Sequence, residues 1–369
     1  MPRLSELDPA IARTSSDSPN LAPFLSGDSA SCGGGGALFL VMHDVCVIIV
    51  SHDGKRWLDA ALSSLFASAG VLDLDVVVVD NGTDGSAAYV EEHFPRARTI
   101  TCQNRGFGAA NNEGLATADA RYVLFLNPDT EFLDGNLAEL IAVMDRRPGV
   151  GLVGVRQVGG SGELAPSMRR FPSTTNMLAE ALAVEKVPLL RRFVGERVLD
   201  PQRYDRESPC DWTSGSFMLV RGQALRVCGG FDERFFLFSE ETDLCWRLRR
   251  GGWGIVHLPL VTIRHFESER SASPLMEAQA AYARLQFARK HFSRVSPYRW
   301  AMALRYALRA GLPAGRGHDQ RRREAGRAAL AAVIDEVPPI AAPAAPPAQA
   351  TTVSAAGMAR SSILSRSPM

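Results

Sequence analysis

The sequence predicts an α/β protein with a mostly parallel, Rossmann-like central sheet flanked by helices. Three apolar runs rich in β-branched residues, 45–50, 75–80 and 121–126, have the character of buried parallel strands. Helical spacing follows each of the first two strands and precedes the third, over residues 57–68, 86–94 and 109–118. Strands that alternate with helices in this way indicate an α/β sheet.

Length and composition exclude several classes of protein. The chain has 369 residues, of which 46% are hydrophobic, and a formal net charge of +1. A sizeable core is therefore expected, and nucleic acid is not the expected partner. The six cysteines form no CxxC pair, which suggests neither a zinc site nor a disulfide framework. No apolar run is long enough to span a bilayer, and no signal peptide is evident, so we expect a cytoplasmic location.

The chain divides by composition into four parts. Residues 1–42 are rich in Ser, Pro and Gly, and we expect a disordered extension or an upstream artefact of a true start at Met42. Residues 43–270 carry the strand pattern and the polar motifs, and the order of elements changes after Val150, which divides them into 43–150 and 151–270. Further elements are expected there: a helix over 177–194 and strands over 212–220 and 255–265. A helical, basic extension (271–336) and a disordered Ala/Pro/Ser-rich tail (337–369) follow.

Polar residues follow each of the three predicted strands. These segments are Ser51-His52-Asp53, Asp80-Asn81 with the Gly-rich turn behind it, and Asn127-Pro128-Asp129. Taken singly, each is an ordinary turn or helix cap. Because parallel strands end at the same sheet edge, the three together indicate a ligand site. Such an edge suits a nucleoside diphosphate, with one carboxylate on the ribose or base and another on a divalent cation.

The most informative segment is 229–247, GGFDERFFLFSEETDLCWR. Three carboxylates, Glu240, Glu241 and Asp243, stand directly behind a run of aromatic residues. A partly buried carboxylate has a raised pKa, which suits a general base. The segment resembles the GGFDExFFxxxEDxDLCxR pattern of family-2 glycosyltransferases of the GT-A fold, within the rhamnosyltransferase-like bacterial group. The resemblance extends from about Val45 to about His265, and it implies a nucleotide-sugar half over 43–150 and an acceptor and catalytic half over 151–270.

The resemblance implies roles for the residues at the strand ends. Asp53 and Asp80 correspond to nucleoside-binding positions, and Asp129 to the last Asp of the metal-binding DxD motif, which is Asn127-Pro128-Asp129 here. His265 would help to hold the metal, Mg²⁺ or Mn²⁺, or the diphosphate; its alternative is a structural histidine. The full set of expected donor-binding residues is Ser51, Asp53, Asp80, Asn81, Asn104, Gly106, Gly108, Asn111, Asn112, Asn127, Trp212 and Gly215.

Two of these segments have alternative interpretations. Segment 104–112 resembles a dinucleotide loop, but the third glycine is missing and the acidic strand end comes before the glycines. In the family it corresponds to a loop through which backbone and Asn side chains approach the nucleotide sugar. Segment 212–218 is either a core strand or a donor contact with Trp212 stacked on a sugar and Gly215 close to it.

The catalytic residues depart from the family pattern at one position. Relatives are inverting enzymes whose base is usually the Asp second in Glu-Asp-x-Asp, and Glu241 takes this position here. We expect Glu241 to be the base, with Glu240 as its substitute. Asp243 would orient neighbours or bind the acceptor, although an i,i+4 pair with Arg247 is the structural alternative.

Two basic regions complete the prediction. Arg169 and Arg170 would reach phosphates of the donor or of a lipid-linked acceptor; the alternative is a solvated basic loop. Residues 298–327 interleave Arg with Trp300 and other apolar residues, as in an amphipathic helix on the inner face of an anionic membrane. The alternative is a helix packed on the enzyme with a solvated basic face.

The resemblance implies an inverting transfer of a sugar from a nucleotide-sugar donor to a cell-envelope glycan or polyprenyl-linked acceptor. Subgroup resemblance favours rhamnose from dTDP-rhamnose. UDP-galactofuranose and UDP-hexoses are the alternative donors. A catalytically silent glycan-binding protein is the alternative of another class, suggested by Glu241 and by the single Asp of the metal motif.

Overall fold

The computed structural model describes residues 42–184, 187, 193–266, 273–311, 318–340 and 352–353. The expected N-terminal extension, up to residue 41, lies outside the described residues, as do 341–351 and 354–369 of the expected tail. The following description concerns the unit that begins at Met42.

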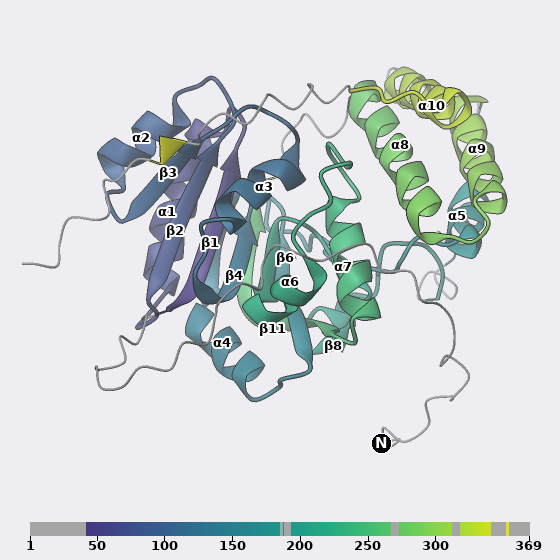
Figure 1. Cartoon of the computed structure of the whole chain (residues 1–369). Coiled ribbons are helices and arrows are strands. Elements are labelled where there is room, and N and C mark those ends of the chain that lie inside the picture. The colour runs from purple at the N-terminus through teal and green to yellow at the C-terminus, as the bar shows by residue number, and fades with distance from the viewer. Residues whose placement is uncertain are drawn as a thin grey trace, which may run out of the picture. The chain divides into compact units, whose positions relative to one another are not determined.

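One large mixed sheet organises this unit (Figure 1). Among the described residues its strand order is β12-β3-β2-β1-β4-β10-β6-β11-β5, and β8 pairs with β11. Neighbours β3-β2-β1-β4 and the pair β6-β11 are parallel, whereas β10, β5, β8 and β12 run antiparallel to their partners. The strands are β1 (His43–Ser51), β2 (Leu74–Asp80), β3 (Ala97–Thr101), β4 (Ala120–Leu126), β5 (Thr130–Gly135), β6 (Val150–Val158), β8 (Ser208–Pro209), β10 (Phe217–Arg221), β11 (Gly254–His265) and β12 (Thr352–Val353).

Both faces of the sheet are covered, which explains why its central strands are continuously apolar. On β1, Val45, Val47 and Ile49 belong to one core, and the alternating residues 46, 48 and 50 belong to another. The helices on the first face are α1 (Lys55–Ser68), α2 (Ser86–His93) and α4 (Leu137–Asp145). Those on the second are α3 (Phe107–Leu115), α6 (Gly222–Cys228) and α7 (Glu240–Arg250).

Three C-terminal helices and α5 form a separate core beside the sheet (Figure 1). These helices are α5 (Thr174–Ala181), α8 (Pro274–His291), α9 (Ser296–Gly311) and α10 (His318–Asp335). Leu285, Tyr298, Met302, Tyr306 and Val333 are buried in this core. A short 3₁₀ helix, η2 (Pro201–Arg203), and a two-stranded sheet, β7 (Met168–Arg169) with β9 (Trp212–Thr213), complete the described elements.

Two expected elements differ from the structure. The helix expected over 177–194 ends at Ala181, because Ala183 adopts a left-handed backbone conformation with φ 53°; residues 185–186 and 188–192 lie outside the described range. The strand expected over 212–220 is divided. Its first part, β9, pairs with β7 in the small sheet, and its second part, β10, belongs to the large sheet.

The register of the parallel strands brings the predicted strand ends to one edge. Ser51 at the end of β1 pairs with Asp80 at the end of β2, and Ile49 pairs with Leu126 at the end of β4. On the far side, His265 at the end of β11 is opposite Thr130 at the start of β5. The fold therefore collects residues from four separate parts of the chain at the carboxyl edge of the sheet.

Candidate active site

A large cavity of about 1640 Å³ opens at this edge. Its wall is formed partly by the ends of β1, β2 and β4 and partly by α5, α8, α9 and α10. Nine of the residues selected from the sequence line it: Asn81, Asn104, Gly106, Asn127, Asp129, Arg169, Trp212, Glu241 and His265. The other selected residues lie behind this wall, and their contacts explain their positions.

Ser51 and Asp80 hold the loop that carries the donor edge. The Oδ1 and Oδ2 atoms of Asp80 accept the backbone N–H groups of Gly82 at 3.0 Å and Ala87 at 2.8 Å. The hydroxyls of Ser51 and Ser86 are 2.8 Å apart. Both side chains therefore fix the turn from β2 into α2.

Asp53 binds the same loop from the other side. Its Oδ1 accepts the N–H of Thr83 at 2.8 Å and the hydroxyl of Thr83 at 3.2 Å. Its backbone has φ 53°, so the turn after β1 is sharply bent at this residue. Asp53 thus ties the β1 turn to the β2 turn.

Asn81 presents a buried acceptor without a protein partner. Within the described residues its Oδ1 has no hydrogen-bond partner, whereas its backbone carbonyl is 3.1 Å from His52 Nδ1. Asn104, which also lines the cavity, accepts the Gly106 N–H at 3.1 Å. A buried unpaired acceptor is costly unless a ligand donates to it, so Asn81 is suited to a donor group of a bound molecule.

The glycines of segment 104–112 make room for the aromatic loop that contains Phe231 and Phe236. Gly106 has φ 106°, and an added Cβ would lie 2.2 Å from the carbonyl oxygen of Phe236, which accepts the Phe107 N–H at 3.0 Å. A Cβ on Gly108 would lie 3.0 Å from the Cβ of Phe231. These glycines allow α3 to approach the aromatic loop closely, and Gly106 alone of the two also lines the cavity.

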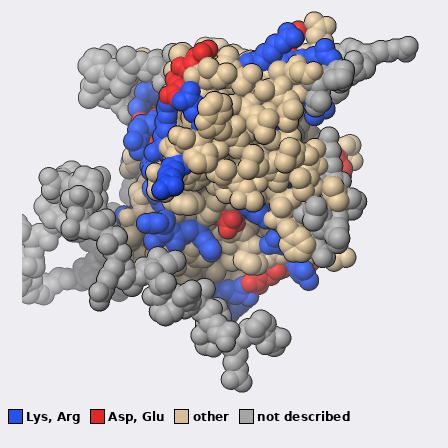
Figure 2. Space-filling model, turned by 90° about the vertical axis from the view of Figure 1, so that its right-hand side faces the viewer, with Lys and Arg blue, Asp and Glu red and all other residues tan. Residues whose placement is uncertain are grey.

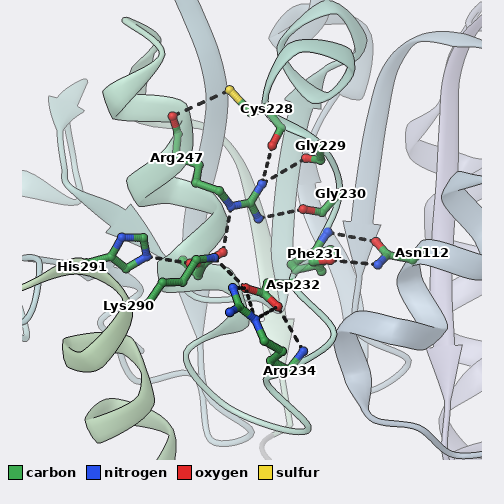
Figure 3. A network of polar contacts seen from close by, with 11 residues as sticks. Asn112, Cys228, Gly229, Gly230, Phe231, Asp232, Arg234, Arg247, Lys290 and His291 are labelled. Atoms are coloured by element: carbon green, nitrogen blue, oxygen red, sulfur yellow. Dashed lines mark hydrogen bonds and ion pairs between the residues drawn. The ribbon is translucent and has the colours of Figure 1, made fainter. Parts of the chain in front are cut away.

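The two asparagines expected to contact a sugar do not line the cavity. Asn111 is buried and donates to the Phe107 carbonyl at 3.0 Å within α3. Asn112 donates to the Phe231 carbonyl at 2.9 Å and accepts the Phe231 N–H at 2.9 Å (Figure 3). Both amides are used to hold backbone.

Asp129 and His265 converge at the sheet edge, together with Asn127. His265 Nε2 is 3.3 Å from Asp129 Oδ1 and 3.4 Å from Asn127 Nδ2. The β5–β11 ladder fixes this approach, because the Asp129 carbonyl also accepts the Phe266 N–H at 3.0 Å. Both side chains are largely buried, with 11% of Asp129 and 14% of His265 exposed.

This pair fits a divalent cation as a partial ligand set. No group of three or more His, Cys, Asp and Glu side chains that could hold a metal occurs among the described residues. A carboxylate oxygen and an imidazole nitrogen from the protein leave further coordination positions for oxygens of a ligand and water. Mg²⁺ and Mn²⁺ are commonly bound in this shared manner.

The acidic motif opens α7. The chain enters the helix through Phe238 and Ser239, whose φ angles are 69° and 66°. Glu240 and Glu241 lie in the first turn, where the helix dipole favours negative charge. Glu241 lines the cavity, Glu240 is buried behind it, and the Oε2 atom of each lacks a hydrogen-bond partner.

Burial gives these two glutamates unusual acid–base properties. It raises the pKa of Glu241, and it raises the pKa of Glu240 well above its ordinary value, with the charge of Glu241 as a second cause. We therefore take Glu240 to hold a proton when Glu241 is ionised. A carboxylate with a raised pKa beside a cavity is suited to accept a proton from a bound hydroxyl.

Asp243 has a different environment, away from the cavity lining. Its Oδ2 accepts from Arg247 Nε at 2.8 Å, and its Oδ1 lies 2.5 Å from Lys290 Nζ and 2.7 Å from His291 Nε2 (Figure 3). Burial alone would raise the pKa of Asp243, but the hydrogen bond from His291 and the charge of Arg247 outweigh it, so the pKa is lowered. The i,i+4 pair with Arg247 is thus present, and Asp243 fastens α8 to α7.

The remaining selected residues surround Trp212. The Arg169 guanidinium lies 5.7 Å from the Trp212 ring centroid, and both side chains line the cavity. Arg170 instead donates to the carbonyls of Gly195 at 3.0 Å and Arg197 at 3.3 Å. Gly215 does not line the cavity, and a Cβ there would make ordinary contacts.

Comparison with known proteins decides the family. Residues 46–210 match the profile of Glycosyl transferase family 2. The chain is 30% identical over 286 residues to the N-acetylglucosaminyl-diphospho-decaprenol L-rhamnosyltransferase of Mycobacterium tuberculosis, covering 72% of this chain and 91% of that protein. The chain belongs to glycosyltransferase family 2.

Other similarities of this glycosyltransferase agree. It is 26% identical over 231 residues to rhamnosyltransferase WbbL of Escherichia coli, covering 60% of this chain and 83% of WbbL. The structure of GalNAc-T7 with UDP, GalNAc and Mn²⁺ matches with a TM-score of 0.53 at 12% identity, covering 81% of this chain and 57% of that one. The predicted GT-A fold is confirmed.

The sequence analysis left out two further parts of the cavity lining of this glycosyltransferase, and only the first of them had a signal in the sequence. His52 and Phe107 line the cavity and stand within motifs that pointed to this edge, so their positions were accessible to the same argument. The wall formed by α5, α8, α9 and α10 could not be predicted, because nothing in the sequence of those helices indicates that they face the sheet edge.

Within the described part of the enzyme, no helix is both long and apolar enough to cross a bilayer.

Proposed function

We propose that this enzyme is an inverting glycosyltransferase that moves rhamnose from dTDP-rhamnose to a polyprenyl-diphosphate-linked saccharide or another cell-envelope glycan. The observation that carries the proposal is that Asp129, His265 and Glu241 line one cavity. Asp129 and His265 could then act on the leaving diphosphate, and Glu241 on the attacking hydroxyl, from two sides of one bound sugar. The names of the two relatives support rhamnose, and that of the mycobacterial relative supports a decaprenyl-diphosphate acceptor.

Glu241 is the proposed base. It takes the proton of the acceptor hydroxyl, whose oxygen then forms the bond to the anomeric carbon as the bond to the nucleoside diphosphate breaks. A single base on one face, with no protein nucleophile on the other, gives inversion. Glu240, which is buried behind Glu241, is the proposed substitute base if Glu241 is removed.

Asp129 and His265 are the proposed cation ligands. A Mg²⁺ or Mn²⁺ ion at this position would neutralise the charge that develops on the leaving diphosphate. The contact between the two side chains, 3.3 Å, supports this assignment because their donor atoms already converge. Asn127 lies beside them and would contact the diphosphate through its amide.

The donor's nucleoside is proposed to contact Asn81 and Asn104. The unpaired Oδ1 of Asn81 supports a hydrogen bond from the base or ribose. Asp53 and Asp80 then act by shaping the loop that carries Asn81, in agreement with their backbone contacts. Trp212, on the cavity wall, is the proposed stacking surface for a sugar.

Peripheral contact with a membrane is part of the proposal. Figure 2 views the side on which α9 and α10 lie in Figure 1, and it shows Lys and Arg side chains gathered beside a broad area of other residues. On α9, Trp300 is 75% exposed and Leu304 41%, one helical turn apart. The arginines of α9 form ion pairs, Arg299 with Glu336, Arg305 with Glu180 and Arg309 with Glu277, whereas Arg321 and Arg327 of α10 are exposed. Tyr298, Met302 and Tyr306 of α9 are buried against neighbouring helices, so a helix packed on the enzyme with a solvated basic face remains the alternative.

Nucleotide release from purified enzyme tests the proposal. The protein is incubated with dTDP-, UDP- and GDP-sugars with Mn²⁺ or Mg²⁺, and again with EDTA. Metal-dependent release from dTDP-rhamnose supports it. Release from UDP-galactofuranose or a UDP-hexose alone would show that the donor is that sugar and not dTDP-rhamnose. If no donor gives nucleotide release or a thermal shift, the silent glycan-binding alternative is favoured. Failure to cosediment with anionic phosphatidylglycerol vesicles would reject the membrane contact.

A further inference from the structure

The cavity is larger than one small ligand requires. Ligand pockets usually measure about 300–1,000 Å³, whereas this cavity measures about 1640 Å³. The proposed donor contacts belong to the sheet edge. The wall formed by Arg169 of β7, by α5, α8, α9 and α10 and by residues 195–199 is therefore available to a second molecule.

This second wall carries a surplus of positive charge. Its arginines are Arg169, Arg197, Arg284, Arg305, Arg309 and Arg322, and its glutamates are Glu180, Glu196 and Glu277. Each glutamate pairs with one arginine: Glu196 with Arg284 at 3.3 Å, Glu180 with Arg305 at 2.9 Å and Glu277 with Arg309 at 2.5 Å. Among the described residues no acidic side chain forms an ion pair with the other three, Arg169, Arg197 and Arg322.

Arg169 is the half-buried member of this surplus, and its Nε atom is fully buried. Its Nε has no hydrogen-bond partner in the described structure. A backbone bridge sets Arg169 beside Arg197, so two guanidinium-bearing residues are neighbours. Burial, and then the charge of Arg197, lowers the pKa of Arg169. The charge of Glu196 opposes this shift, and a bound phosphate would stabilise the guanidinium further through paired hydrogen bonds.

The arginines are also close to the proposed base. The positive charges of Arg169 and Arg284 both oppose the effect of burial on the pKa of Glu241. An anion held by Arg169 would therefore lie in the neighbourhood of the hydroxyl that Glu241 deprotonates. A saccharide linked to a diphosphate presents a hydroxyl and phosphate groups within one sugar of each other.

We propose that Arg169 and Arg197, with Arg284 beside them, form a subsite for the phosphate groups of the acceptor. This inference rests on the proposed function, which assigns the donor diphosphate to Asp129 and His265. Arginine suits the role because its planar guanidinium binds phosphate oxygens in pairs. Arg284 is already oriented by Glu196, which leaves Arg169 and Arg197 as the residues to test.

Binding of a soluble prenyl diphosphate tests the subsite in the full chain. Farnesyl diphosphate is titrated calorimetrically into wild type, Arg169→Ala and Arg197→Ala, and dTDP with Mn²⁺ is titrated separately. We expect each variant to weaken farnesyl diphosphate binding about tenfold or more, as for a lost hydrogen bond to a charged group, and to change dTDP binding less than about twofold. Arg197 is exposed, so its variant is not expected to impair folding. Arg146→Ala, an exposed arginine outside the cavity lining, is the matched control.

Three results of the farnesyl diphosphate titrations would overturn the inference. They are absence of farnesyl diphosphate binding by wild type, wild-type binding by both variants, and an equal loss in Arg146→Ala. Weakened dTDP binding in either variant would assign the arginines to the donor and also overturn it. Failure of wild type to bind dTDP or UDP would reject the proposed function instead, while the farnesyl diphosphate titration would still report on the arginines.

Discussion

Asn112 is hydrogen bonded to both backbone polar groups of Phe231, at 2.9 Å in each case (Figure 3). The two residues are 119 positions apart in the sequence. Gly230 is part of the same contact, because a Cβ there would lie 2.4 Å from Asn112 Oδ1. The amide therefore joins α3 to the loop that leads into α7.

Replacing Asn112 with Leu should destabilise the enzyme. It would leave the Phe231 N–H and C=O unpaired, at about 1–3 kcal/mol for each buried group. Urea unfolding measures the loss, and Gln103→Ala, an exposed position just before α3, should change stability by less than about 0.5 kcal/mol. Equal stability of Asn112→Leu and wild type would show that the contact contributes nothing.

Glu241→Gln should abolish most transfer without unfolding the protein. Loss of a general base typically lowers kcat about 10²–10⁴-fold, and the amide keeps the shape of the side chain. The measurement is kcat and donor KM with any active donor and acceptor pair. Glu241→Asp, which restores the residue usual in the family, should retain part of the activity. A Glu241→Gln enzyme with wild-type kcat would exclude Glu241 as the base.

Glu240→Gln should stabilise the folded protein as the pH rises. Because the folded-state pKa of Glu240 lies above its unfolded value of about 4.3, the native state binds more protons and its stability falls as the pH rises through the folded-state pKa. Because the amide of the variant cannot ionise, the variant does not lose this stability as the pH rises. Thermal unfolding of variant and wild type at pH 5 and pH 8 should show a larger advantage at pH 8. A stability advantage of the variant that is smaller at pH 8 than at pH 5 would contradict a raised pKa of Glu240.

Asp243→Asn should have the opposite pH dependence. The folded-state pKa of Asp243 is lowered, so its contribution is present above its unfolded pKa of about 3.9 and is lost as the pH falls through the folded value. At pH 7 the variant should lose about 3–5 kcal/mol, the cost of breaking a buried ion pair. Urea unfolding from pH 7 to pH 3 checks this, and a loss that stays constant over this range would argue against ionisation as the cause.

Asp129→Asn and His265→Ala should each increase the Mn²⁺ concentration needed for half-maximal activity, by about tenfold or more. Titration of the rate with Mn²⁺ measures this, and direct Mn²⁺ binding in the presence of nucleotide gives an independent value. Glu131→Gln is a suitable control, since Glu131 pairs with Arg264 on the neighbouring strands. An unchanged Mn²⁺ requirement in both variants would place the cation elsewhere.

The parts of the fold that were predictable are those buried on both faces. β1, β2 and β4 are continuously apolar because helices cover both sides of the sheet, and this signal is local to each strand. Segment 212–220 misled the prediction because its apolar residues belong to two sheets, a fact set by distant partners.

The site divides in the same way. The placement of Asn127, Asp129 and His265 at one sheet edge was predictable. Asn127 and Asp129 follow β4, His265 ends β11, and strands that run in the same direction end at the same edge. The contact of the Asn112 side chain could not be predicted, because its partner Phe231 lies 119 residues away in the sequence. Lys290 and His291 end a helix, where a basic residue ordinarily complements the helix dipole. Nothing local indicates that both reach Asp243.

The contacts of Asp243 set a condition on chimeric enzymes. An exchange of the C-terminal helices between relatives would naturally be cut between β11 and α8. Such a junction separates Asp243 from Lys290 and His291, which lie on opposite sides of it. A graft that brings a foreign α8 must therefore supply cations at these two positions, or the recipient's α7 will retain a buried negative charge matched only by Arg247.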